Sequence, residues 1–317
     1  MIYTTLDSDE KIIAQAKRWE KYPSLAVDFE GEFNLHIYGE HLCLIQIYDT
    51  EGFWIIDPRS RNVTAKGLEA FFSLPSEKIW FDIQGDASLV YRLYGLKINN
   101  VFDVRVLAME LGYKGNLLGL VKEYLGINVE INKKKNQQAN WLKRPIDVDL
   151  MEYALLDVKY LHALKDVLSS IVAKEGLEDR VRASMARAMI VKEPLPGWKN
   201  ICSWDRLNRR EKAYVRNIFI ARDKIAQSFN VPAARVMDKH HILSLAKNPP
   251  KSRKELVERL SSEPQRFRSL LLDKVAFALE RAEKELENST RPQALLQCRA
   301  HPLDRPWCRG RMKCTFL

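Results

Sequence analysis

The sequence predicts an α/β domain with a mixed β-sheet, followed by a small all-helical bundle. From residue 24 to 175, strand-like segments first follow one another through short turns and then alternate with helical segments. From 200 to 287 nearly all segments have helical periodicity. We therefore expect a first domain at 1–175, a helical linker at 176–199, the bundle at 200–287 and a basic, disordered tail at 288–317.

The first domain opens with an amphipathic helix in residues 7–22, which we expect Ser8 to cap. The apolar segments "SLAVDFEG", "LCLIQIYD" and "GFWIIDP" then predict three strands at 24–31, 42–49 and 52–58. Because only short turns separate them, they should form an antiparallel meander. Further helices are expected at 63–75, 87–95, 105–112, 117–126 and 148–172, with strands at 78–82 and 101–104.

Composition indicates a globular protein of the cytoplasm. The chain has 317 residues, 46% of them hydrophobic, and only five cysteines, an odd number that argues against a disulfide framework. The opening residues lack the layout of a signal peptide, and no apolar run approaches the roughly 20 residues needed to span a bilayer. We expect no membrane partner.

The net charge of +10 is unevenly distributed. Residues 1–170 hold 20 Lys+Arg against 24 Asp+Glu, whereas residues 171–317 hold 31 against 17. A basic module beside a mildly acidic one predicts that the second half binds a polyanion while the first keeps its acids for chemistry. The alternative is a basic surface that only aids solubility.

Two acids interrupt the apolar strand at 24–31. Asp28 and Glu30 are two positions apart, so their side chains share one face of the strand. At about 7 Å and an effective dielectric constant near 20, two such charges repel by roughly 2 kcal/mol. This predicts a cation between them, and the alternative is an exposed strand face.

Three more residues have the placement that a metal site needs. Asp86 lies at the start of a predicted helix, and Tyr153 and Asp157 share one helix face at a spacing of four residues. Four carboxylates around one cavity favour hard divalent cations such as Mg²⁺ or Mn²⁺. Two such ions about 4 Å apart are typical of phosphoryl chemistry.

The motifs "AVDFEGEF", "DASLVYRLYG" and "EYALLDVKYL", in this order, resemble those of DEDD-type 3′–5′ exonucleases. With "LCLIQIYD", "IIDP" and "NWLKRP", the first domain resembles ribonuclease D. The segment "VPAARVMDKHHILSLAKNPPKSRKELVERL" resembles the helical HRDC domain that follows the nuclease in that family and helps to bind nucleic acid. The resemblance implies a ribonuclease H-like mixed sheet followed by an HRDC bundle.

The resemblance also implies roles for the acids. Asp28, Glu30, Asp86 and Asp157 would bind two divalent ions, Mg²⁺ or Mn²⁺, and Tyr153 would place the chain in the tyrosine subgroup, where the phenol helps to position the attacking water. One departure is the segment "FDIQGD", in which Asp82 stands near the position where the family usually has His or Asn. Asp82 is therefore a rival to Asp86.

Two groups of basic residues are candidate nucleic-acid contacts. One is the loop that holds Lys133, Lys134 and Lys135, for which the alternative is a solvated loop without a role in binding. The other is the start of the bundle, where arginines alternate with aromatic residues that could also belong to the core. Its candidates are Arg206, Arg209, Arg210 and Arg216.

We therefore expect a 3′–5′ exoribonuclease that acts on RNA with a single-stranded 3′ end, such as a transfer-RNA precursor or another stable RNA. Its products would be nucleoside 5′-monophosphates. One alternative is a 3′–5′ DNA exonuclease, because the same four acids serve both and recognition of the 2′-hydroxyl is made elsewhere. Another is a non-catalytic RNA-binding protein on a decayed nuclease fold.

Overall fold

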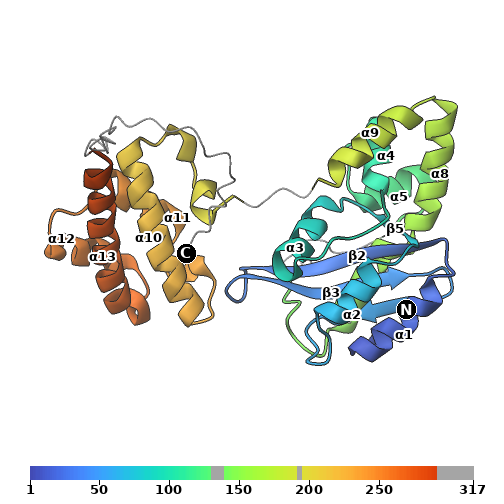
Figure 1. The fold of residues 1–317 in the computed structure, drawn as a ribbon, viewed down its shortest axis with the longest axis horizontal. Helices are drawn as coiled ribbons and strands as arrows, with labels where there is room; N and C mark the ends of the chain where they lie inside the picture. Colours follow the sequence, from blue (N-terminus) through green and yellow to red (C-terminus); the bar gives the residue numbers. More distant parts are fainter. Residues whose placement is uncertain (130–138, 191–194, 291–317) are drawn as a thin grey trace, which may run out of the picture.

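The computed structural model describes residues 1–129, 139–190 and 195–290. It contains a sheet domain and a helical bundle (Figure 1), which confirms the predicted fold class. The predicted contacts Lys133, Lys134 and Lys135 lie outside the described residues, as does most of the predicted tail. None of the helices in the described ranges combines the length and hydropathy that a bilayer crossing requires.

The sheet has six strands in the order β1-β4-β3-β2-β5-β6. The predicted meander is present, because β2 pairs with β3 and β3 with β4 in antiparallel fashion. The other three pairings, β1 with β4, β2 with β5 and β5 with β6, are parallel, so the sheet is mixed. The strands are β1 (Tyr3–Leu6), β2 (Ser24–Phe33), β3 (Glu40–Tyr48), β4 (Phe53–Ile56), β5 (Glu77–Trp80) and β6 (Val101–Asp103).

Helices cover both faces of the sheet. Ser8 caps the first helix, as predicted, by accepting a hydrogen bond from the Lys11 backbone N–H. The predicted helix at 148–172 is divided at Tyr160, where the backbone leaves the regular helix. The helices are α1 (Asp9–Trp19), α2 (Ala65–Phe72), α3 (Gln84–Tyr94), α4 (Val104–Glu110), α5 (Leu117–Leu125), α7 (Val148–Lys159), α8 (Leu161–Lys174) and α9 (Glu178–Ala188).

Strand β2 is buried on both faces, and the two faces have different neighbours. Leu25, Val27 and Phe29 belong to a core with α1, α2 and α3. Ala26 belongs to a second core, formed with α4, α5 and α8 on the opposite face. Helix α7 packs on this second face, against β2 and β3. Asp28 therefore lies between the sheet and α7, because it shares a face with Ala26.

The bundle is all-helical, with its core between two long helices, α10 (Arg209–Ser228) and α13 (Gln265–Thr290). Tyr214 and Phe267 are its largest fully buried side chains. The shorter helices are α11 (Lys239–Lys247) and α12 (Arg253–Arg259), together with the 3₁₀ turns η1 (Gly197–Asn200), η2 (Trp204–Arg206), η3 (Ala233–Arg235) and η4 (Leu260–Ser262).

The hairpin between β2 and β3 contacts the bundle, as Figure 1 shows for its blue tip. Tyr38 packs against the core of the bundle, and its hydroxyl donates a hydrogen bond of 3.4 Å to Asp223 on α10. The backbone N–H of Ala233 donates to the Asn34 side chain, also at 3.4 Å. The strand that carries Asp28 and Glu30 is thus continuous with the contact between the two domains.

Candidate active site

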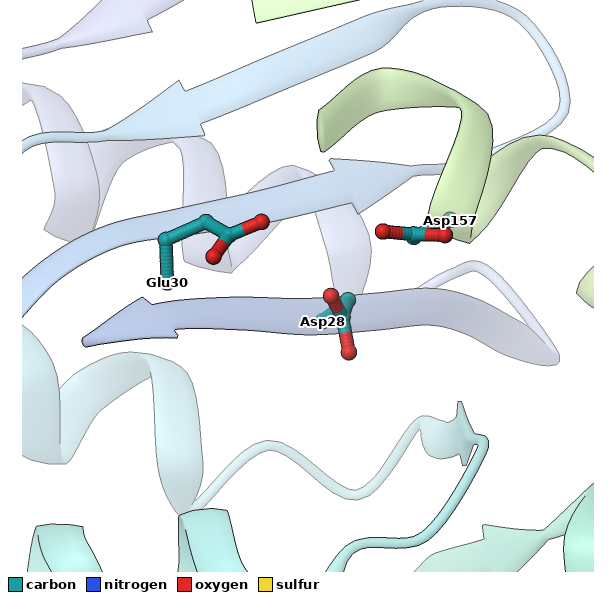
Figure 2. A group of neighbouring side chains, drawn as sticks. All are labelled: Asp28, Glu30 and Asp157. Atoms are coloured by element: carbon teal, nitrogen blue, oxygen red, sulfur yellow. The ribbon is translucent and has the colours of Figure 1, made fainter. Parts of the chain in front are cut away.

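Three of the predicted carboxylates meet on the face of β2 that α7 covers. Asp28 and Glu30 project from β2, and Asp157 comes from α7. One carboxylate oxygen from each lies within 4.8 Å of the other two. Figure 2 shows the carboxylates of Glu30 and Asp157 facing each other, with Asp28 below the gap that separates them. We call these three residues the carboxylate cluster.

Burial and mutual repulsion make ionisation of the cluster unfavourable. Burial raises the pKa of Asp28 well above its usual range, and the neighbouring charges of Asp157, Asp86 and Glu30 raise it further. Burial likewise raises the pKa of Glu30, with added contributions from Asp157 and Asp86. A bound cation would reverse this balance, because it favours the ionised form of each carboxylate. The half-buried side chains keep some access to solvent.

Asp86 lies beside the cluster but is not one of the three residues in it. It sits in the first turn of α3, a helix that begins without a side-chain cap. The indole Nε1–H of buried Trp80 donates a hydrogen bond of 3.0 Å to Asp86 Oδ2. Burial, with a smaller contribution from the charges of Asp82 and Asp103, raises the pKa of Asp86 to about 7 despite that hydrogen bond.

The rival residue, Asp82, has a different environment. Its side chain is exposed and forms an ion pair with Arg105. Its backbone has a positive φ of 72°, and the turn is held by Asp103, whose carboxylate accepts the backbone N–H groups of Asp82, Ile83 and Arg105 at 2.9 to 3.1 Å. Asp86 is the better candidate for the fourth acid, because its charge raises the pKa of both Asp28 and Glu30.

Tyr153 lies one helical turn before Asp157 on α7 and is half-buried. Burial raises the pKa of its phenol above the usual 10, and the charges of Asp157, Glu30 and Asp28 raise it further, as does a hydrogen bond to Asp157. The phenol is therefore protonated at neutral pH. It can donate a hydrogen bond but cannot act as a general base.

Replacement of Tyr153 by phenylalanine should slow catalysis by roughly 10- to 100-fold, as is typical for loss of a group that orients a reactant or ligand. This loss should be smaller than that of Asp28→Ala, because the carboxylates remain. The measurement is single-turnover shortening of labelled RNA at saturating Mg²⁺, with Tyr160→Phe as control, since Tyr160 stacks against Lys159 at the end of the same helix. Equal losses in Tyr153→Phe and Asp28→Ala would contradict this division of roles.

The predicted arginines of the bundle have varied surroundings. Arg210 and Arg216 pair with Glu283 and Glu285 on α13, and Arg206 is exposed in η2. Arg209 and Arg216 also line a cavity of about 760 Å³. The indoles of Trp198 and Trp204 share this cavity with Lys199 and Lys212, and the Lys212 ammonium lies 5.7 Å from the Trp204 ring.

Sequence reasoning missed three residues at the site. Trp80 and Asp103 hold Asp86 and the turn before it, and Gln46 on β3 lies in register with Asp28. Trp80 and Gln46 sit inside apolar strands, where the pattern reads as core. The predicted meander places the strands of Asp28 and Gln46 side by side. Which residues face each other depends on the geometry of the hairpin, which the sequence pattern does not give.

Known families match both domains. The family described as 3′–5′ exonuclease matches residues 3–173, and the HRDC domain family matches residues 211–269. Among curated proteins, ribonuclease D of Sphingobium indicum is 26% identical over 264 residues, which cover 79% of this chain and 66% of that protein. Ribonuclease D of Nitrobacter hamburgensis is 25% identical over 292 residues, which cover 87% and 74%. The chain thus spans about two thirds to three quarters of these relatives.

Solved structures show the same fold. The catalytic core of RRP6 from Trypanosoma brucei superposes with a TM-score of 0.71 at 22% identity, covering 91% of this chain and 80% of that one. RNase D of Escherichia coli, described as an exoribonuclease involved in structured RNA processing, gives a TM-score of 0.69 at 25% identity, covering 88% and 75%. These likenesses extend over both the sheet domain and the bundle.

Proposed function

The chain belongs to the 3′–5′ exonuclease family and carries an HRDC domain after the nuclease domain, and from this premise we propose that it is a 3′–5′ exoribonuclease of the ribonuclease D type. The observation that carries the proposal is the cluster of Asp28, Glu30 and Asp157, whose oxygens lie within 4.8 Å of one another. The products would be nucleoside 5′-monophosphates. The proposed nuclease domain spans 1–175, followed by a linker at 176–199, the HRDC-like domain at 200–287 and a basic tail at 288–317.

Two divalent cations, Mg²⁺ or Mn²⁺, are part of the proposal. The donor set fits them, because it consists of carboxylate oxygens and hard oxygen ligands suit these ions. The ligands would be Asp28, Glu30 and Asp157, joined by Asp86. When bound, such ions lower the pKa of water and stabilise the leaving oxygen of a phosphodiester.

The protein side chains have separate tasks. The carboxylates fix the site by their positions on strand β2 and on helices α3 and α7, which pack on the sheet that contains β2. Trp80 holds Asp86 by its indole N–H. Tyr153, protonated at neutral pH, donates a hydrogen bond and so orients a group in the site without accepting its proton.

RNA with a single-stranded 3′ end is the proposed substrate, for example a transfer-RNA precursor. The ribonuclease D relatives support this class, and so does the basic second half of the chain. The cavity beside Arg209 and Arg216 combines cations with two indoles, a combination that suits phosphates and stacked bases of a single strand. Lys133, Lys134 and Lys135 remain proposed contacts from the sequence.

The test is incubation of the purified chain with a 5′-labelled RNA that carries a single-stranded 3′ tail, beside its DNA twin, in Mg²⁺, Mn²⁺ or EDTA. A metal-dependent ladder that shortens from the 3′ end on RNA supports the proposal. A ladder mainly on DNA would instead make the chain a DNA exonuclease. Tight RNA binding without shortening in either metal would leave a binding protein on a nuclease fold.

A further inference from the structure

Gln46 is a fully buried side chain whose amide has no partner. It is 0% exposed, and neither its Oε1 nor its Nε2 has a hydrogen-bond partner in the part of the chain that the structure describes. Buried amides are nearly always paired, because an unpaired donor or acceptor loses its bonds to water without replacement. An amide kept in such a place indicates a partner in another state of the protein.

The position of Gln46 indicates which partner this is. Gln46 lies on β3 directly opposite Asp28 on β2, and Ile55 on β4 is its partner on the other side. Directly opposed residues of an antiparallel pair share a face, with Cβ atoms about 4.5 to 5.5 Å apart. Gln46 is therefore on the face of the carboxylate cluster, within reach of Asp28 by side-chain rotation.

Among the described residues, the other neighbours of Gln46 are mostly apolar. On the same strand face its neighbours are Leu44 and Tyr48, two residues away on either side. Leu44 and Ile55 belong to an apolar core with residues of α7, which covers this part of the sheet. A fully buried side chain cannot touch RNA. The cross-strand carboxylate is the polar group in register with the amide.

We propose that Gln46 is a positioning residue of the metal site, an inference that rests on the proposed function. Its Nε2 donates a hydrogen bond to the Asp28 carboxylate when that group is ionised and holds a cation. The bond fixes the carboxylate so that its other lone pairs face the site. Outer hydrogen bonds of this kind typically contribute about 10- to 100-fold to metal affinity or activity.

The test compares Gln46→Met, which removes the amide at similar length, with Gln15→Met. Gln15 is also buried, at 5% exposure, but it lies on α1, which packs against the opposite face of the sheet. Mn²⁺ affinity is measured by calorimetry on the full chain, and melting temperature is measured in EDTA. Single-turnover RNA shortening gives the rate constant and the RNA concentration at half-maximal rate.

Gln46→Met should bind Mn²⁺ about tenfold more weakly and shorten RNA more slowly. The RNA concentration at half-maximal rate should be unchanged. Its melting temperature in EDTA should equal or exceed that of the wild type, because an unpaired buried amide is replaced by an apolar group. Gln15→Met should leave Mn²⁺ affinity unchanged.

Wild-type Mn²⁺ affinity in Gln46→Met would overturn the inference. A lower melting temperature of this variant in EDTA would also overturn it, because damage to the fold would then explain the loss of Mn²⁺ affinity. Absence of Mn²⁺ binding to the wild type would overturn it together with the metal site. Mn²⁺ binding without any RNA shortening would overturn the proposed function alone, because the affinity comparison still holds.

Discussion

Replacement of Asp28 by asparagine should lower the rate of RNA shortening on the order of 10³-fold, which corresponds to about 4 kcal/mol of transition-state stabilisation. Asp28 belongs to the cluster with Glu30 and Asp157, and its amide analogue carries no charge to hold a cation. The change is nearly isosteric, so the core around β2 should stay packed. In EDTA the variant should melt at the same or a higher temperature, because burial and neighbouring acids oppose ionisation of Asp28.

The measurement is single-turnover shortening of labelled RNA in Mg²⁺, together with thermal unfolding in EDTA. Asp166→Asn is the matched control, because Asp166 is an exposed acid on α8 of the same domain. It should shorten RNA at the wild-type rate. If Asp28→Asn shortens RNA at a rate within tenfold of the wild type, Asp28 is not a catalytic residue. A lower melting temperature in the variant would show that the loss reflects damage to the fold.

The parts of the fold that depend on local pattern were predictable. The alternation in β2 placed Asp28 and Glu30 on one face, and the spacing of Tyr153 and Asp157 placed both on one side of a helix. The meander followed from short turns between apolar segments. These features require only the periods of strand and helix and the length of the connections.

Features that depend on distant contacts were not predictable. Strand β1, at Tyr3–Leu6, is largely exposed and gains its order from parallel pairing with β4, about 50 residues away in sequence. The register shift between Glu30 and Gly31 redirects the next acid, Glu32, whose carboxylate accepts the backbone N–H of His36 at 2.9 Å. Simple alternation would have added Glu32 to the cluster.

Asp86 shows the same limit at the site. The motif predicts that Asp86 is a ligand, but its pKa of about 7 reflects burial, which raises it, and the hydrogen bond from the Trp80 indole, which lowers it. Neither can be read from spacing, because burial and the hydrogen bond between Trp80 and Asp86 both depend on the tertiary fold. The sequence therefore predicted which acids form the site, whereas the structure was needed to show which neighbours bond to them and shift their pKa values.

Removal of divalent metal with EDTA should abolish RNA shortening at every pH, and the stability gained from Mn²⁺ should grow as pH rises from about 5 to 8. The pKa values of Asp28 and Glu30 are raised in the folded chain, and that of Asp86 is raised to about 7, whereas unfolded carboxyls titrate near 4. Between these limits the folded state binds more protons than the unfolded state. The metal-free chain should therefore lose stability as pH rises through this window.

A cation that binds ionised carboxylates releases those protons, so its affinity increases over the same range. Melting temperatures in EDTA and in Mn²⁺ should accordingly diverge with rising pH, and the difference should be smaller in Asp28→Asn. The buried amine of Lys78, whose pKa burial lowers to about 8, acts in the opposite sense but mainly above pH 8. A difference that stays constant from pH 5 to 8 would show that the cluster does not bind the metal. Thermal unfolding at matched ionic strength decides the point, because the pH slope measures proton uptake directly.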